Sequence, residues 1–444
     1  MKPSIPKGTR DFLPEQVAKR NYIFSTIRSA FEQFGFVQIE TPAMEVLSTL
    51  TGKYGEEGDK LLFKILNNGD FLAKADHQAL EEKNSNKLIP SISKRGLRYD
   101  LTVPFARYVV MHQNDLYFPF KRYQIQPVWR ADRPQKGRYQ EFYQCDADVV
   151  GSDSLTYEAE LIQILNLVFD KLNIDVSIKL NNRKVLFGMA EVCGLTDRFM
   201  DLTIAVDKLD KIGLEGVKDI LIKKQIPEEA IHKILEFLSL KGLDQLESFL
   251  KDSETGLKGI EELKEVIGYL PDTINNFEID VTLARGLNYY TGCIIEVASN
   301  EVQIGSISGG GRYDDLTASF GLKDMSGVGI SFGAARIYDV LEELNRFPAT
   351  VIKGVQALIC PLDDSCRKYA FNLTTTMRAS NVLVDMYPSA AKMAKQLKYA
   401  DKRNIPYAVI IGSEEMESGI LSLKNLKTGE QHKLTLDEII NRLS

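Results

Sequence analysis

Residues 121–151 constrain the fold of this chain more than any other stretch, because their pattern predicts two strands joined by a polar loop. Apolar and polar side chains alternate over residues 123–130, and an extended pattern resumes over residues 140–150. The segment between them, residues 131–139, contains a proline, a glycine and several cations. The pattern therefore predicts a β-hairpin whose loop is suited to an anion.

The charged residues of this hairpin indicate what it could bind. Cations gather at the loop, and one side of the second strand carries two carboxylates and an amide. This arrangement would suit a polyphosphate held beside a small cationic or amino-bearing substrate. A solvated surface hairpin with scattered charge fits the same spacing, so spacing alone leaves both interpretations open. The residues concerned are Arg130, Arg133, Lys136 and Arg138 at the loop, and Gln144, Asp146 and Asp148 on the strand.

Length and charge limit the class of protein. The 444 residues, 44% hydrophobic and 26% charged, are enough for two or three globular domains. A formal net charge of −6 argues against a general polyanion binder. From residue 351 onward, however, 13 Lys and Arg stand against 10 Asp and Glu, a net charge of +3. This mild asymmetry permits a nucleic-acid contact there, and it fits an ordinary lysine-rich domain equally well.

The five cysteines and the amino terminus bear on the cellular compartment. The cysteines are scattered and form no CxxC pair, so the sequence suggests neither a zinc site nor a disulfide framework. The first 16 residues have no apolar core of the kind found in a signal peptide. No run approaches the roughly 18 apolar residues of a membrane span. We therefore expect a cytoplasmic protein with no membrane contact.

Two segments before the hairpin carry further predictions. Residues 14–34 have helical apolar spacing, and the alternating residues 36–41 follow them and end at a proline, which is a plausible dimerisation element. Residues 96–104 also alternate, which predicts a strand with Arg98, Asp100 and Thr102 on one face. Burying these groups is costly unless they meet a polar ligand or each other. A ligand site and an internal salt bridge are both consistent with the pattern.

Beyond the hairpin, the chain changes character twice. Residues 183–270 are rich in charged and aliphatic residues at helical spacing, which predicts a helical insertion between two β-containing parts. Strands are then predicted near residues 277–283 and 293–297. The three glycines at 309–311 permit close backbone approach, or a tight β corner. Residues 327–336 run from small residues into a helix that bears Arg336 near its start.

The last part of the chain has its own pattern. A linker is predicted at residues 347–353. Four predicted strands and three predicted helices follow in about 90 residues, which indicates a compact α/β domain with a partly parallel sheet. One of these helices, residues 390–403, carries several lysines.

Taken together, these motifs resemble the histidyl-tRNA synthetases, a family of class II aminoacyl-tRNA synthetases. The helix and strand ending at Pro42, the hairpin with WRADRPQKGRYQEFYQ, and GVGISFGAARI resemble the three motifs of the class. LRYDLT at residues 97–102 and ARGLNYYTG at residues 284–292 resemble the two motifs specific to the histidine enzymes. The segment GGGRYDDL at residues 309–316 strengthens the resemblance, which covers essentially the whole chain in the expected order.

The resemblance implies an α+β fold in four segments. An antiparallel sheet flanked by helices would form the catalytic core from residues 1–182 and 271–346. Residues 183–270 would be the helical insertion, and residues 347–444 an α/β anticodon-binding domain. Neither a P-loop nor a Rossmann glycine pattern occurs in the sequence, which agrees with a class II nucleotide site built on a sheet.

The resemblance also implies an activity. The enzyme would be a histidine–tRNA ligase that activates L-histidine with ATP, accompanied by Mg²⁺, and transfers the histidyl group to tRNA(His), as a homodimer. No protein metal ligands are implied. The implied catalytic residues are Arg130 and Arg285. The implied histidine-binding residues are Asp100, Leu101, Thr102, Arg130, Gln144, Asp148, Arg285, Tyr289 and Tyr290, and the implied ATP-binding residues are Arg130, Arg138, Phe142 and Arg336.

Two alternatives belong to other classes of function. Synthetase-like regulatory proteins keep the fold without the chemistry, and they tend to lose the arginine of the histidine-specific motif or the anticodon domain. This chain has both Arg285 and a predicted C-terminal domain. The second alternative is an RNA-binding module that acts through the C-terminal lysines. The chain departs from other members at Tyr99 and Asp100, where they carry Pro-Glu.

Overall fold

The computed structural model describes residues 2–53, 55–284, 290–352, 354–389 and 391–443. The chain forms two compact units, Met1–Pro348 and Ala349–Ser444. Each unit has its own hydrophobic core, so each is described separately.

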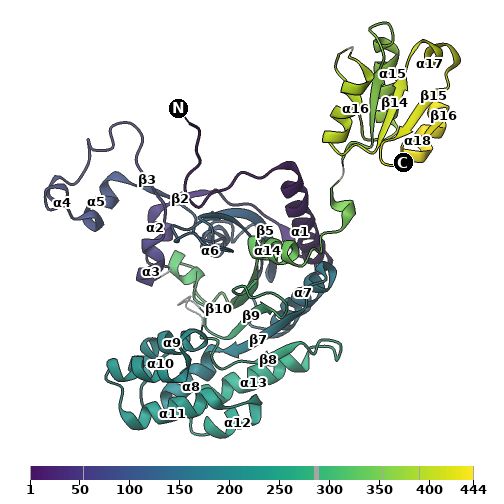
Figure 1. Ribbon diagram of the computed structural model, residues 1–444. Coiled ribbons are helices and arrows are strands. Elements are labelled where there is room, and N and C mark those ends of the chain that lie inside the picture. Colours follow the sequence, from purple (N-terminus) through teal and green to yellow (C-terminus); the bar gives the residue numbers. More distant parts are fainter. Residues whose placement is uncertain (1, 54, 285–289, 353, 390, 444) are drawn as a thin grey trace. The chain divides into compact units, whose positions relative to one another are not determined.

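An eight-stranded, mostly antiparallel sheet is the frame of the first unit (Figure 1). Its strand order is β1-β5-β6-β11-β10-β9-β7-β8. Only the outermost pairs, β1 with β5 and β7 with β8, are parallel. The strands are β1 (Val37–Gln38), β5 (Phe120–Trp129), β6 (Glu141–Val150), β7 (Val176–Asn182), β8 (Phe277–Ile279), β9 (Cys293–Ser299), β10 (Ser308–Tyr313) and β11 (Gly327–Gly333).

The predicted hairpin is confirmed, with β5 and β6 antiparallel over their full lengths. One face of it packs on helices. Tyr123 of β5 and Cys145 and Ala147 of β6 are buried in the main core. There the ring of Phe31 lies 5.5 Å from that of Tyr123 and 5.8 Å from that of Phe332. Because side chains alternate along a strand, Gln144, Asp146 and Asp148 face the other way.

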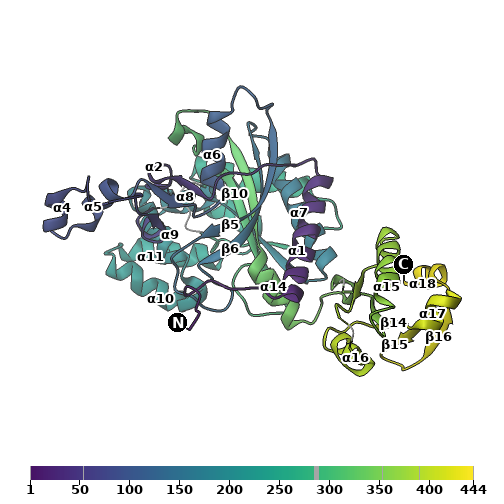
Figure 2. The same cartoon turned by 90° about the horizontal axis from the view of Figure 1, so that it is seen from above.

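Three helices cover the apolar face. They are α1 (Pro14–Gln33), α7 (Thr156–Leu172) and α14 (Ala334–Glu343). The helix predicted for residues 14–34 is thus confirmed, and α1 lies alongside α7 (Figure 2). Burial of Ile23, Ile27 and Phe31 on one side of α1 follows from their helical spacing.

A second sheet of the first unit has three strands in the order β2-β4-β3. The strand predicted over residues 96–104 is largely wrong. The observed strand β4 ends at Leu97, and α6 begins at Thr102, so Arg98 and Asp100 lie in the connection. The Asp100 carboxylate accepts a hydrogen bond from the Val103 amide at 3.1 Å, which satisfies a donor of the first helical turn. The bounds are β2 (Met44–Val46), β3 (Lys64–Ile65), β4 (Arg95–Leu97), α2 (Leu47–Leu50), α3 (Gly55–Lys60), α4 (His77–Glu81), α5 (Ser85–Ile92) and α6 (Thr102–Met111).

The segment between β7 and β8 is helical (Figure 1, teal). Its first helix, α8, and its last, α13, pack against each other and against β7. Lys184 of α8 pairs with Glu262 of α13, and the same carboxylate accepts from Asn182 at the end of β7. The helices are α8 (Arg183–Val192), α9 (Phe199–Val206), α10 (Leu209–Lys223), α11 (Glu228–Ser239), α12 (Gly242–Phe249) and α13 (Glu254–Gly268).

The second unit is a five-stranded mixed sheet with order β13-β12-β14-β15-β16. The first three strands in this order are parallel and the last two are antiparallel, which confirms the predicted partly parallel sheet. The elements are β12 (Ala357–Pro361), α15 (Arg367–Ala379), β13 (Val384–Met386), α16 (Met393–Lys402), β14 (Tyr407–Ile411), α17 (Ser413–Ser418), β15 (Leu421–Asn425), β16 (Gln431–Leu434) and α18 (Leu436–Leu443).

Candidate active site

The polar face of the hairpin and its neighbour β11 form three rows of facing residues. Strand register determines the rows, since directly opposite residues project from the same side of the sheet. The rows are Arg122, Asp148 and Gly329; Gln124, Asp146 and Ser331; and Gln126, Gln144 and Gly333.

Asp148 is held from two sides in the first row. Arg122 Nη2 lies 2.7 Å from its Oδ2, and the Tyr313 hydroxyl donates to its Oδ1 at 2.6 Å. Asp148 and Arg122 are both buried. Burial raises the pKa of Asp148, against the opposing influence of Arg122 and Tyr313. The carboxylate therefore has a defined orientation before any ligand arrives.

Two glycines make room for this carboxylate and for Tyr290. A Cβ atom on Gly329 would lie 2.0 Å from Asp148 Oδ1, and one on Gly311 would lie 3.0 Å from Tyr290 Cδ1. Gly311 and Gly329 are directly paired across β10 and β11. The glycine run also permits the close backbone approach predicted from the sequence, since a Cβ atom on Gly310 would lie 2.0 Å from the Gly329 carbonyl oxygen. Gly311 and Gly329 thus leave room for Tyr290 and Asp148 in one part of the sheet.

The second and third rows contain acceptors that lack donors. Gln144 Nε2 donates to Ser331 Oγ at 2.9 Å, and Asp146 lies directly opposite Ser331 across β6 and β11. Within the described part of the chain, Gln144 Oε1, Asp146 Oδ1 and Gln124 Oε1 are buried without a hydrogen-bond partner. Buried acceptors without donors lower the stability of the folded protein, so these two rows are suited to a ligand that donates hydrogen bonds.

The charges around these rows favour a cation. Asp100, Asp146 and Asp148 are all buried, and Arg122 is the guanidinium that counters Asp146 and Asp148. Arg98 is buried too, but its guanidinium donates instead to oxygens of Thr41, Pro42, Gln126 and Pro127. Burial, reinforced by Asp148 and Asp100 and opposed by Arg122, raises the pKa of Asp146 to about 7.

The predicted residues 100–102 lie at the start of α6, next to this cluster. The Leu101 carbonyl accepts from Arg122 Nη2 at 3.5 Å. Asp100 and Leu101 are buried, and Thr102 is half-buried. The structure therefore brings this motif to the acidic end of the hairpin, although the motif is not the predicted strand.

Arg130 lies at the opposite end of the hairpin. Its Nε donates to the Tyr99 carbonyl at 3.0 Å, and its guanidinium lies 4.2 Å from the Tyr99 ring centroid and 5.2 Å from that of Phe142. Among the described residues, its two terminal nitrogens have no hydrogen-bond partner. A cation held by its inner nitrogen and two rings is well placed to offer its outer edge to a phosphate.

Arg336 joins the hairpin loop to the rest of the sheet. Its Nε donates to the Gly137 carbonyl at 3.1 Å, and its Nη1 donates to the Ser306 carbonyl. Arg138, in the same loop, is half-exposed and lies 3.8 Å from Asp132. The loop cation predicted at Arg138 is therefore accessible, and Arg336 lies beneath the loop near the start of α14.

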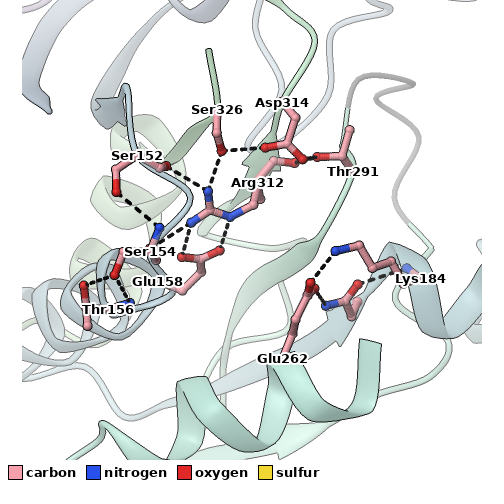
Figure 3. Close-up of polar contacts among 11 residues, drawn as sticks. Ser152, Ser154, Thr156, Glu158, Lys184, Glu262, Thr291, Arg312, Asp314 and Ser326 are labelled. Carbon is pink, nitrogen blue, oxygen red and sulfur yellow. Dashed lines mark hydrogen bonds and ion pairs between the residues drawn. The ribbon is translucent and has the colours of Figure 1, made fainter. Parts of the chain in front are cut away.

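Arg285 and Tyr289 lie outside the described residues. The chain resumes at Tyr290, and the next residue is firmly held (Figure 3). Thr291 donates to Asp314 Oδ2 at 2.5 Å, and its amide donates to the Arg312 carbonyl. Arg312 itself is buried, makes a bidentate pair with Glu158 at 2.5 and 2.6 Å, and also donates to Ser326 at 2.6 Å.

Three residues of the site were missed at the level of sequence. Arg122 falls on the same strand side as Gln124, so the alternation could have revealed it. Ser331 lies in the motif GVGISFGAARI, but its contacts with β6 follow only from the pairing of β11 with β6 and could not be predicted from the motif. Tyr313 meets Asp148 from a position 165 residues away in the chain, a pairing that no local pattern carries.

Within the described residues, no group of three or more His, Cys, Asp or Glu side chains could hold a metal ion. No helix among them is long and apolar enough to span a bilayer.

Comparison with known proteins shows the family of this chain. The family model described as histidyl-tRNA synthetase matches residues 8–73 and 66–337, and the anticodon binding domain model matches residues 356–444. The chain is 58% identical to a histidine–tRNA ligase of Christiangramia forsetii, over 100% of this chain and 99% of the relative.

Solved structures extend the comparison. The crystal structure of histidyl-tRNA synthetase from Nostoc sp. PCC 7120 has a TM-score of 0.81 and 33% identity, covering 100% of this chain and 99% of that one. A Bacillus halodurans protein described as an ATP phosphoribosyltransferase regulatory subunit/histidyl-tRNA synthetase has a TM-score of 0.73. It is 18% identical and covers 93% of this chain and 100% of that one, so it shows the fold alone. The family model and the full-length relative show that this chain belongs to the histidyl-tRNA synthetase family.

Proposed function

We propose that this chain is a histidine–tRNA ligase, which forms histidyl-adenylate from L-histidine and ATP and transfers the histidyl group to tRNA(His). The observation that carries the proposal is the buried cluster of Asp100, Asp146 and Asp148 around Arg122. Its acceptors call for a ligand with several N–H donors, and histidine has an ammonium group and an imidazole. The adjoining cations at the hairpin loop suit a polyphosphate.

The amino acid would occupy the acidic end of the hairpin. Asp100, Thr102 and Gln144 would bind its ammonium group. Asp148 and Tyr290 would contact the two imidazole nitrogens, because a carboxylate accepts a hydrogen bond and a phenol can donate one. Leu101 and Tyr289 belong to the same two motifs, and we assign them to the boundary of this pocket.

ATP would lie along the loop end of the hairpin. Arg130 would contact the α-phosphate, and Arg138 the outer phosphates. Phe142 would stack on one face of the adenine and Arg336 on the other. These assignments are supported by the accessible outer edge of Arg130 and by the contact of Arg336 with the loop.

Catalysis would depend on fixed positive charge. The histidine carboxylate attacks the α-phosphorus, the bond to the bridging oxygen breaks, and pyrophosphate leaves with the electron pair. Negative charge grows on the α-phosphate oxygens, where Arg130 and Arg285 would stabilise it and also contact the histidine carboxylate. The tRNA hydroxyl then attacks the histidyl carbonyl, and AMP leaves. No protein nucleophile is required, because the substrate carboxylate forms the new bond.

Magnesium would enter as the ATP complex, with phosphate oxygens and water as its main ligands. We also propose a cytoplasmic location, since the five cysteines are free thiols. A homodimer would cover the exposed apolar side chains of Val37, Met44 and Val46 near the β1 edge of the large sheet. Sedimentation at about 100 kDa, twice the 50.0 kDa chain, would support the dimer, and a 50 kDa species at micromolar concentration would refute it.

The decisive experiment is ATP–pyrophosphate exchange with each of the twenty amino acids in turn. Exchange with histidine alone, followed by charging of tRNA(His), is the expected result. Exchange with another amino acid would assign the chain to a sister specificity. A regulatory or RNA-binding protein would support no exchange at all, and that outcome would overturn the proposal.

A further inference from the structure

The orientation of the Gln144 amide is set by its neighbours. An amide side chain has one accepting end and one donating end, so only one of its two orientations offers an oxygen to a ligand. Here Nε2 donates to Ser331 Oγ at 2.9 Å, and Oε1 is buried without a partner among the described residues. The oxygen is therefore the end that a ligand would meet.

Ser331 determines this orientation through its single hydroxyl proton. Asp146 lies directly opposite Ser331 in the strand register. Because an ionised carboxylate can only accept hydrogen bonds, it draws the Ser331 hydroxyl proton toward itself. Its oxygen is then left to accept from Gln144 Nε2. The Ser331 backbone carbonyl accepts from Ser308 Oγ at 2.9 Å, which holds this part of β11 in place.

We infer that Asp146, acting through the Ser331 hydroxyl, holds the Gln144 oxygen toward the substrate and so makes the site selective for a ligand with an α-ammonium group. This inference rests on the proposed function, and it goes beyond it by assigning a task to Asp146 and Ser331. Both are positioning residues. Gln144 is the group that touches the ammonium.

The inverse arrangement explains why the charge of Asp146 matters. A protonated Asp146 can donate a hydrogen bond to the Ser331 oxygen. The Ser331 hydroxyl then donates its own proton to Gln144, and the acceptor there must be the amide oxygen. The NH₂ group would face the substrate ammonium and repel it. The charged groups that act on Asp146 are Arg122 on β5, Asp148 on β6, and Asp100 and Arg98 ahead of α6. Burial raises the pKa of Asp146 to about 7, so this exchange falls within an accessible pH range.

The test compares two ligands that differ only in the ammonium group. L-Histidine and 3-(imidazol-4-yl)propanoate share the imidazole and the carboxylate. Dissociation constants are measured by calorimetry for the parent full-length chain, Ser331→Ala, Asp146→Ala and the double variant. The ratio of the two constants reports on the ammonium contacts, because the titration of the imidazole and general damage to the pocket affect both ligands.

We expect Ser331→Ala and Asp146→Ala each to weaken histidine binding about 5- to 50-fold, the usual consequence of misdirecting a hydrogen bond to a charged group. Binding of the analogue should change less than about twofold. Since both residues act on one amide, the double variant should lose no more than a single variant. The parent's preference for histidine should decrease from pH 8 to pH 6, and Asp146→Ala should show no such decrease.

The control is Ser308→Ala, which removes a hydroxyl bonded to the same strand but leaves the relay intact. It should preserve the preference for histidine within about twofold. Equal weakening of both ligands in Ser331→Ala would mean a purely structural role and would overturn the inference. A parent chain without histidine-dependent exchange would instead overturn the proposed function, so the two failures are distinguishable.

Discussion

At the scale of single residues, the Asp146 side chain is buried, and among the described residues no hydrogen-bond donor meets its Oδ1 atom. Its folded-state pKa, raised to about 7, lies above the value of about 4 expected in the unfolded chain. Between these two values the unfolded chain loses its proton and the folded protein keeps it. The contribution of this group to stability is therefore lost as pH rises through this window, and the loss is complete above pH 7.

This argument predicts a stabilised variant. Asp146→Asn carries no charge to bury, so without ligand it should melt at a higher temperature than the parent at pH 8, by a few degrees. The difference should disappear toward pH 4. Calorimetric melting at the two pH values checks this, with the exposed Asp115→Asn as control. An equal shift at both pH values would mean that altered packing, and not charge, is responsible.

Arg285 is the residue on which the proposed chemistry depends most. Arg285→Ala should lower the rate of histidine-dependent ATP–pyrophosphate exchange by about two to four orders of magnitude, as expected for losing a preorganised partner of the developing charge. Arg346→Ala is a suitable control, because that arginine pairs with Glu301 in an exposed ion pair. Exchange within a few-fold of the parent in Arg285→Ala would rule out the catalytic assignment.

At the scale of elements, α16 presents a row of exposed lysines in the second unit, including Lys395 and Lys398. Lysines on one exposed helical face suit an RNA backbone. Lys395→Ala combined with Lys398→Ala should raise the KM for tRNA(His) several-fold and reduce the magnitude of its salt slope by about 2. Exchange with histidine and ATP should be unaffected.

A matched pair of substitutions tests whether any loss of lysine has the same effect. Lys368 and Lys427 are exposed in the same unit but lie outside α16. Their double replacement by alanine should leave the KM for tRNA within about twofold. If both pairs raise KM equally, the effect comes from overall charge and α16 is not the contact surface.

At the scale of the whole molecule, two units with separate cores predict separable steps. The large unit contains the hairpin and all the described residues assigned to histidine and ATP. A chain ending at Pro348 should retain ATP–pyrophosphate exchange within about tenfold, while charging of tRNA(His) falls about 10- to 100-fold through lost phosphate contacts. Far-ultraviolet circular dichroism confirms that the fragment is folded. A folded fragment without exchange would show that adenylate formation requires the second unit.

Much of this molecule could be predicted from local pattern. The hairpin, helix α1 and the partly parallel C-terminal sheet follow from periodicity, because each buries one face and its spacing repeats along the chain. The residue types at the hairpin indicated an anion beside an amino-bearing ligand, with the choice left open. The resemblance of the motifs then pointed to the family.

Tertiary structure decided the rest, for reasons that lie between segments. Alternation at residues 98–102 looked like a strand, but Arg98 bonds to distant backbone oxygens and Asp100 satisfies the first turn of α6. Asp148 meets Tyr313 across 165 residues, and the Ser331 hydroxyl lies between Gln144 and Asp146 only because β6 and β11 pair in one register. Sequence by itself determined where the hairpin, α1 and the C-terminal sheet form. Strand register decided which buried acceptors still lack a donor. The reason is that these hydrogen bonds depend on distances between atoms of different segments, which the pattern of one segment does not give.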